Sequence, residues 1–225
     1  MIKLLKRNYF NVRLYMWLAF FIVSIFFIIF PQIDIKVSSL FYDGSSFYLK
    51  GSTFERFFYN SVKVLLTAFT LGSLGIYIYN KVKKTNILNL NTRVIIYIVL
   101  VLSIAPGVIV NATLKDHWGR ARPAQIKEFG GDKTFTPAFI LSDQKGHSFS
   151  SGHTSAAFAF VGFALLATKR RTFWMSLAIS YGILVSFARL IAGGHFLSDI
   201  LTSFFIVWIV THILYRIIFK KDSCI

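Results

Sequence analysis

The stretch "RLIAGGHFLSDI", Arg189 to Ile200, lies between two long runs of Leu, Ile, Phe and Val. Within it stand an arginine, a histidine and an aspartate. A charged side chain at membrane depth costs a few kcal/mol or more, so such groups face the protein interior or a watery cavity and usually have a function. The stretch therefore predicts a polar site at the turn between two membrane helices.

The composition of the chain indicates a membrane protein. Of its 225 residues, 55% are hydrophobic and 17% aromatic, and the mean hydropathy is +0.61. The net charge of +16 does not indicate nucleic-acid binding, because the Lys and Arg residues punctuate apolar runs instead of forming a basic face. The single cysteine, Cys224, has no partner for an internal disulfide.

The apolar runs predict an all-α, six-helix transmembrane bundle, since a spanning helix needs about 20 mainly apolar residues. Segment 31–58, which mixes aromatic residues with Gly and Ser, predicts a short interfacial helix after the first span. We expect a single domain, 1–225. The predicted spans are 14–30, 62–79, 94–114, 152–168, 173–192 and 197–219.

The charge pattern predicts the orientation of these helices. Basic residues cluster at the N-terminus, at 81–93, at 169–171 and at 216–221, which are alternate ends of the predicted spans. By the positive-inside rule these ends are cytoplasmic, as are both termini. Every Asp and Glu except Asp222 lies at the opposite ends, on the outer side.

Three polar clusters fall on that outer side, and two of them suit a phosphate. Ser151 and Gly152 precede His153 in "FSSGHTSAAF", at the start of the predicted fourth helix. A helix start has unpaired N–H groups and a partial positive charge, which together attract anions. Three cations from "KDHWGRARP" and the opening stretch would complete a phosphate pocket: Lys115, Arg122 and Arg189.

The third cluster predicts a nucleophile. His195 and Asp199 are four residues apart, so on a helix they share one face. A carboxylate there can hold one ring nitrogen of the histidine and leave the other free to attack. The alternative from another class is a small transporter or structural protein with a buried polar network. That alternative fits less well, because the ionisable groups lie at helix ends and the chain has no internal repeat.

Together these motifs resemble the three-part signature of the type 2 phosphatidic acid phosphatase superfamily, over the region from Lys115 to Asp199. The resemblance implies that His195 attacks phosphorus, Asp199 orients it and His153 protonates the leaving oxygen, with no metal or other cofactor. It also implies which residues bind phosphate: Lys115, Arg122, Ser151, Gly152 and Arg189. Ser150 replaces the usual proline and Ala188 a frequent serine, and neither change removes a reactive group.

Within the superfamily, the six-helix layout and the segments "DHWGRARP" and "EFGGDKTFTPAF" are most similar to bacterial lipid A phosphatases, the 4′-phosphatase type more than the 1-phosphatase type. This implies a multi-pass protein of the bacterial inner membrane, with its active site facing the periplasm and a lipid phosphate substrate in the outer leaflet. Undecaprenyl diphosphate and phosphatidylglycerophosphate are alternative substrates for the same residues. The sequence leaves open the acyl-chain preference, the oligomeric state and any substrate contact by Lys63, His117 or His147.

Overall fold

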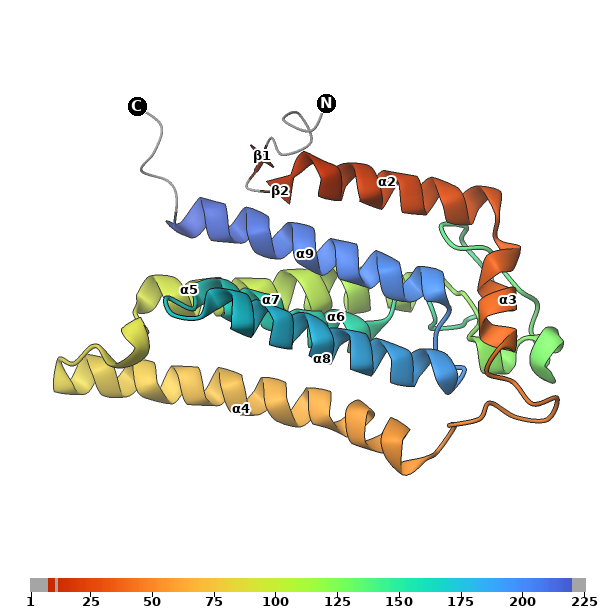
Figure 1. Cartoon of the computed structure of the whole chain (residues 1–225), viewed down its shortest axis with the longest axis horizontal. Coiled ribbons are helices and arrows are strands. Elements are labelled where there is room, and N and C mark those ends of the chain that lie inside the picture. The colour runs from red at the N-terminus through yellow and green to blue at the C-terminus, as the bar shows by residue number, and fades with distance from the viewer. Residues whose placement is uncertain (1–7, 11, 220–225) are drawn as a thin grey trace.

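The computed structural model describes residues 8–10 and 12–219, and this part of the chain is almost entirely helical (Figure 1). Apart from a two-stranded hairpin of two residues per strand, helices lie side by side and loops gather at one end. The elements are β1 (Asn8–Tyr9), β2 (Val12–Arg13), α2 (Leu14–Ile29), α3 (Gln32–Ser39), α4 (Thr53–Lys83), η1 (Ile87–Asn89), α5 (Thr92–Leu102), η2 (Ser103–Lys115), η3 (Pro123–Gln125), η4 (Lys127–Phe129), α6 (Gly152–Phe158), α7 (Phe160–Leu166), α8 (Arg171–Ile191) and α9 (Leu197–Phe219).

The first apolar helix is followed by a short helix that turns sharply away. α2 ends at Ile29, and α3 begins after Pro31 at an angle of 88° to it. Proline has no N–H and disfavours the helical conformation at the preceding residue, so it ends α2. Figure 1 shows α3 across the end of the bundle at which α9 begins, and the two helices are in contact.

The second long helix starts nine residues earlier than expected. α4 covers Thr53–Lys83, so the prediction that segment 31–58 stays outside this helix is wrong for its last residues. The reason is a local cap: Ser52 Oγ accepts a hydrogen bond from Glu55 N, and Glu55 Oε2 accepts one from Gly51 N at 2.6 Å. A serine followed three residues later by glutamate is a helix-start signal, and it extends α4 to the site described below.

The next two predicted helices are present, but neither is regular. Segment 92–115 is one continuous helical stretch, of which Ser103–Lys115 has the wider π winding around Pro106, whose missing N–H interrupts the α-helical ladder. The predicted helix 152–168 is divided at Ala159 into α6 and α7 and ends at Leu166. The break at Ala159 is fully buried among neighbouring helices, whereas the π-wound segment is partly exposed, with Val108 facing outward.

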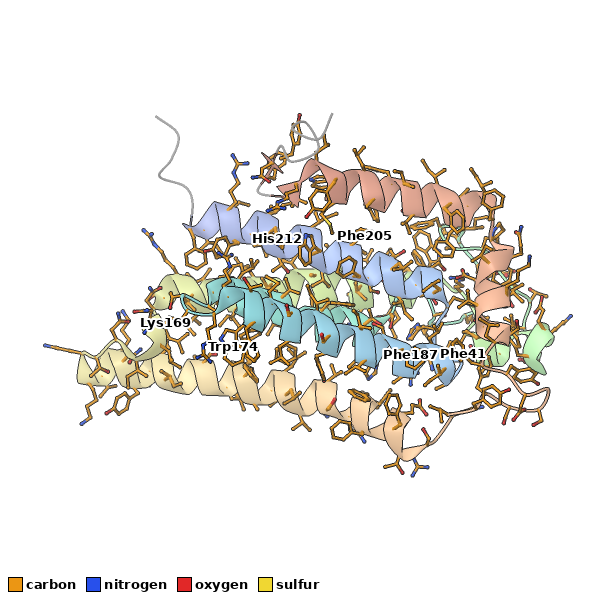
Figure 2. All side chains as sticks on the ribbon, in the orientation of Figure 1. Phe41, Lys169, Trp174, Phe187, Phe205 and His212 are labelled. Atoms are coloured by element: carbon orange, nitrogen blue, oxygen red, sulfur yellow. The ribbon has the colours of Figure 1, made fainter. Side chains whose placement is uncertain are left out.

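The last two helices agree closely with the predicted ranges 173–192 and 197–219. They flank α6, which lies at the centre of the bundle because it packs against α8, α9, η2 and α4. Close approach of α6 and α8 requires Gly182, where an added Cβ would lie 2.4 Å from the Phe158 ring. At the α3 end, Phe41 contacts Phe187 of α8 at 5.9 Å between ring centroids, as labelled in Figure 2.

The helices identify a multi-pass membrane protein. α4, α5 with η2, α8 and α9 are each long and apolar enough to cross a membrane, and the bent pair α2 and α3 is a fifth candidate. The helical segment 152–166 is a shorter apolar stretch. Large hydrophobic side chains such as Ile22, Val64 and Leu71 remain exposed on these helices, as expected for surfaces that face lipid. The all-helical fold class is therefore confirmed.

Candidate active site

The structure brings the three predicted clusters together at the α3 end of the bundle. Lys115 ends η2, His153 is the second residue of α6, and His195 lies between α8 and α9. The charges of Arg189, Lys115 and Arg122 all act on His153, and so does His195. Residues up to 80 positions apart in the sequence therefore share one electrostatic environment.

His195 is buried, and its ring is held from one side. Its Nδ1 lies 2.8 Å from the Ser148 carbonyl oxygen and 3.7 Å from Asp199 Oδ2. A ring nitrogen facing a carbonyl must carry the proton, so Nε2 has the free lone pair. The expectation that His195 shares a helical face with Asp199 is wrong, because α9 begins only at Leu197. A loop carbonyl, in addition to Asp199, orients the imidazole.

The surroundings of His195 keep its imidazole neutral. Burial lowers the pKa of His195 below its ordinary value, and the positive charges of Arg189 and Arg122 act in the same direction. Asp199 opposes them but does not reverse the shift. A neutral imidazole with an unprotonated Nε2 is the form that acts as a nucleophile at pH 7.

Asp199 is fully buried and saturated with hydrogen bonds. Its carboxylate accepts from Ser148 Oγ at 2.6 Å, from Phe196 N at 2.9 Å and from Arg120 Nη1 at 2.5 Å. Ser148 therefore bridges the pair, since its hydroxyl donates to Asp199 and its carbonyl accepts from His195. These contacts fix the carboxylate beside the ring.

Arg120 is the largest fully buried side chain of the described residues, and sequence reasoning missed it. Its guanidinium donates to Asp199, to Asp34 Oδ2 at 2.8 Å and to the Thr136 carbonyl at 2.8 Å, and lies 4.3 Å from the Phe196 ring centroid. Burial by itself would lower the pKa of Arg120, but the carboxylates of Asp199 and Asp34 more than offset it and raise that pKa above its ordinary value. The one feature of the sequence that could have pointed to Arg120 is its position inside "DHWGRARP", between the predicted phosphate-binding residues Lys115 and Arg122.

Asp34 brings α3 into the same network. Its carboxylate accepts from Ser198 N at 3.0 Å and from Ser198 Oγ at 2.5 Å, in addition to its ion pair with Arg120. It therefore satisfies N–H and O–H groups at the start of α9, as an acid at a helix N-terminus does. The sharp turn at Pro31 carries this acid into the core, and from the sequence it was only one of several acids on the outer side.

We expect Arg120→Met to destabilise the protein strongly. The substitution leaves Asp34 and Asp199 buried without their cation, and breaking a buried ion pair in this way costs about 3–5 kcal/mol. The measurement is the temperature of half-unfolding in detergent, with Lys127→Met as the matched control at an exposed position. An unchanged midpoint for Arg120→Met would contradict the bridging role.

The predicted phosphate-binding cations lie close to one another. Lys115 is half-buried near Arg122 and Arg189, whose charges both act on it. Neither Lys115 nor Arg122 forms an ion pair with a carboxylate within the part of the chain that the structure describes. Arg189 pairs with Glu55 at 2.5 Å. Three cations with one carboxylate partner leave a net positive charge, which attracts a phosphate.

The start of α6 is closely packed. Ser151 is fully buried, its Oγ accepts from Thr154 N at 3.4 Å, and its carbonyl accepts from Ser203 Oγ at 3.0 Å. Its side chain is thus occupied as a helix cap. At Gly152 an added Cβ would lie 2.6 Å from Asn111 Oδ1, so glycine lets the backbone approach η2. These contacts place the N–H groups that precede His153.

Three further residues on the outer side, whose substrate contacts the sequence leaves open, lie as follows. Lys63 is exposed on α4. His117 Nδ1 lies 3.2 Å from the Thr113 carbonyl, and His147 Nδ1 lies 3.1 Å from the Lys115 carbonyl. In the described residues, no group of three or more His, Cys, Asp and Glu side chains has an arrangement suited to a metal ion.

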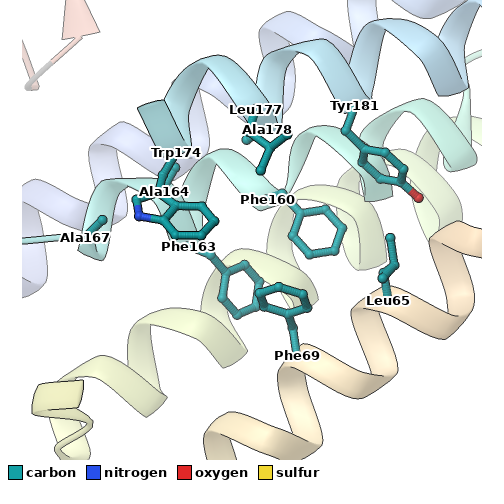
Figure 3. Close-up of a pocket in the computed structure, with 10 residues that line it drawn as sticks. All are labelled: Leu65, Phe69, Phe160, Phe163, Ala164, Ala167, Trp174, Leu177, Ala178 and Tyr181. Carbon is teal, nitrogen blue, oxygen red and sulfur yellow. The ribbon is translucent and has the colours of Figure 1, made fainter. Parts of the chain in front are cut away.

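An apolar pocket of about 420 Å³ lies farther along α4, between α4, α7 and α8 (Figure 3). Its lining includes Leu65, Phe69, Phe160 and Trp174, with Tyr181 at one end. Tyr181 is hydrogen-bonded to Ser61 at 2.8 Å. This lining suits hydrocarbon, and the pocket carries none of the charged groups described above.

A histidine, an aspartate and a set of basic residues at one end of a helical membrane bundle form a site suited to a phosphate group. The chain belongs to the PAP2 superfamily, whose family model matches residues 96–223. It is 35% identical to the lipid A 4′-phosphatase of Francisella tularensis subsp. novicida over 216 residues. This alignment covers 90% of this chain and 94% of that protein. It is also 35% identical over 102 residues to the lipid A 4′-phosphatase of Rhizobium leguminosarum, 44% of each chain. No solved structure matches the chain significantly. The resemblance read from the three motifs is confirmed.

Proposed function

We propose that the protein is a lipid A 4′-phosphatase that works through a phosphohistidine on His195. The observation that carries the proposal is the state of His195: it is buried, the charges of Arg189 and Arg122 help to keep it neutral, its Nδ1 is bound to the Ser148 carbonyl, and its Nε2 is free. The substrate class rests on the alignment with the Francisella lipid A 4′-phosphatase over 90% of the chain.

The first chemical step is the transfer of the phosphoryl group to His195. Lys115, Arg122 and Arg189 hold the phosphate oxygens, and Nε2 attacks phosphorus as the bond to the sugar oxygen breaks. His153 donates its proton to that oxygen, so the sugar leaves as an alcohol. Two cations on arginine and one on lysine also offset the charge that develops on the phosphoryl oxygens.

The second step releases phosphate. His153, now unprotonated, takes a proton from water as the water oxygen attacks phosphorus, and the P–N bond breaks to regenerate neutral His195. In the intermediate the imidazole carries positive charge, which the Asp199 carboxylate at 3.7 Å from Nδ1 stabilises. Arg120 and Ser148 keep that carboxylate ionised and in place.

For the membrane arrangement, we propose one domain of six spanning segments with the site at the periplasmic face and α3 at the interface. The support is the distribution of charge: every Asp and Glu of the described residues lies in segments at the α3 end, and basic clusters such as Lys81–Lys84 lie at the other (Figure 1). Helix 152–166 is the shortest of the six, about 22 Å at 1.5 Å per residue.

This orientation predicts opposite labelling at the two ends of the bundle. In a Cys224→Ser background, Asp132→Cys near the site is expected to react with an impermeant maleimide in intact spheroplasts, because exposed Asp132 faces the periplasm. Lys83→Cys, exposed at the end of α4, is expected to react only after permeabilisation. The reverse pattern would overturn the orientation.

The experiment for the activity uses the purified full-length chain with three separate substrates: lipid A, phosphatidylglycerophosphate and undecaprenyl diphosphate. We expect phosphate release from lipid A, with mass spectrometry showing loss at the 4′ position and retention at the 1 position. Faster turnover of either alternative lipid, or loss at the 1 position, would refute the 4′ assignment.

The proposed chemistry needs no divalent ion, because His195 supplies the nucleophile and the cations supply the charge. We expect full activity in EDTA and inhibition by vanadate, whose five-coordinate form resembles the transition state. Phosphate release in EDTA and after adding back Mg²⁺ or Zn²⁺ is the measurement. Loss of activity in EDTA with recovery on adding a metal would exclude this mechanism.

A further inference from the structure

The first two turns of α4 contact two side chains of the candidate active site. Glu55 and Tyr59 are one helical turn apart, so they share a face of α4. Glu55 Oε1 lies 2.5 Å from Arg189 Nη1, and the Tyr59 ring lies 4.0 Å from the His153 ring between centroids, tilted by 30°. Both residues precede the region that the family model matches.

The His153 ring depends on Tyr59 for its orientation. In residues 8–10 and 12–219 no hydrogen bond holds either ring nitrogen of His153, whereas His195 is held through Nδ1 by the Ser148 carbonyl. A general acid must point its N–H at the leaving oxygen within about 2.6–3.2 Å. The tilted ring contact with Tyr59 is in a position to set the plane of the His153 imidazole.

Arg189 is held by the same two residues. Its guanidinium carbon lies 5.1 Å from the Tyr59 ring centroid. Glu55 accepts a hydrogen bond from only one guanidinium nitrogen, Nη1. Arg189 Nε is buried and has no hydrogen-bond partner. The side chains of the ion pair are 7% and 15% exposed, so the contact is shielded from water. The guanidinium nitrogens of Arg189 that Glu55 does not engage remain available to a phosphate oxygen.

We propose that Glu55 and Tyr59 are positioning residues of the reaction: Tyr59 orients the general acid His153, and Glu55 orients the phosphate-binding fork of Arg189. The inference rests on the proposed function, since it assigns these two roles to His153 and Arg189. It makes the start of α4 a fourth part of the site, beside the three sequence motifs.

The test for Tyr59 compares leaving groups. Tyr59→Leu removes the ring, and Tyr59→Phe keeps it. With lipid A, Tyr59→Leu is expected to lower kcat by about 10-fold to 100-fold, the scale of a misplaced catalytic group. With 4-nitrophenyl phosphate, whose phenolate leaves without a proton, the loss is expected to stay within about threefold. Tyr59→Phe is expected to stay within about threefold on both substrates. Tyr59 is 43% exposed, so the substitution opens no core cavity.

Tyr79→Leu is the matched control on the same helix, where Tyr79 is 50% exposed and outside the site. It is expected to leave both rates unchanged. Equal losses on both substrates for Tyr59→Leu, or no loss on lipid A, would overturn the positioning role. His153→Ala is measured in parallel to distinguish failure of this inference from failure of the proposed function. If His153→Ala loses more activity on lipid A than on 4-nitrophenyl phosphate and Tyr59→Leu does not, only the role of Tyr59 fails. If His153→Ala loses the same activity on both substrates, the assignment of His153 as the general acid fails as well.

The test for Glu55 measures anion binding. Glu55→Ala frees the fork, and Glu55→Gln keeps a hydrogen-bond acceptor at the same place. We expect the inhibition constant of orthovanadate to rise about tenfold or more in Glu55→Ala and to stay within about threefold in Glu55→Gln. Tighter vanadate inhibition in Glu55→Ala would show that Glu55 competes with phosphate for Arg189, and an unchanged constant would show that it has no effect. Either result would overturn its positioning role.

Discussion

His195→Ala is expected to lower kcat by at least about 10⁴-fold on lipid A and on 4-nitrophenyl phosphate alike, because no phosphoenzyme can form without its Nε2. The expected result is a rate at background with both substrates, whatever the leaving group. Phosphate release under saturating substrate is the measurement, together with acid-labile ³²P labelling of the denatured protein after brief exposure to labelled substrate.

The control for this substitution is His117→Ala, which removes an exposed imidazole two residues beyond η2, whose Nδ1 lies 3.2 Å from the Thr113 carbonyl. It is expected to retain wild-type activity within about twofold and the same labelling. Labelling of the His195→Ala variant at the wild-type level would place the covalent intermediate on another residue.

His153→Ala is expected to show the second-largest effect, but only with a poor leaving group. Expulsion of a sugar alkoxide needs a proton, and loss of general acid catalysis lowers kcat by about 10²–10⁴-fold. A nitrophenolate leaves without that proton, so the loss on 4-nitrophenyl phosphate is expected to be at least about tenfold smaller. The comparison uses kcat, since the small substrate lacks the lipid contacts that govern KM.

Equal losses on both substrates would assign His153 to phosphate positioning instead of proton transfer. Comparing these two substrates thus distinguishes the role of His195 from the role of His153. The two histidines also differ in their surroundings: His195 is buried and held through Nδ1, whereas His153 is half-buried and in tilted ring contact with Tyr59.

The sequence predicted most helices well, because an apolar run of membrane length has few other ways to satisfy its backbone. It was less accurate at helix starts and breaks. α4 begins at Thr53 because Ser52 and Glu55 form a cap, a signal present in the sequence but outweighed by the surrounding aromatic residues. The division of helix 152–166 at Ala159 has no such local signal, since Ala159 lies between Phe158 and Phe160 with no Pro or Gly at the break.

The candidate site was predicted in its reactive groups but not in their partners. Its three motifs name a histidine pair, an aspartate and the cations, and the structure places them at one end of the bundle. The partners Ser148, Arg120, Asp34, Glu55 and Tyr59 were not predicted. Each is an ordinary residue in a loop or helix, and its spacing from the residue it holds follows no regular period.

By itself, the sequence determined the membrane class, the family and the identity of the candidate reactive side chains, because hydropathy and residue type are local properties. Only the tertiary structure decided how those side chains are held. His195 is oriented by a carbonyl 47 positions earlier, and Arg120 is paired with an acid 86 positions earlier. The physical reason is the cost of burying charge. When α3, α9 and the loop of Arg120 pack together, the buried carboxylates of Asp34 and Asp199 need a cation beside them. No local sequence pattern indicates that this cation is Arg120.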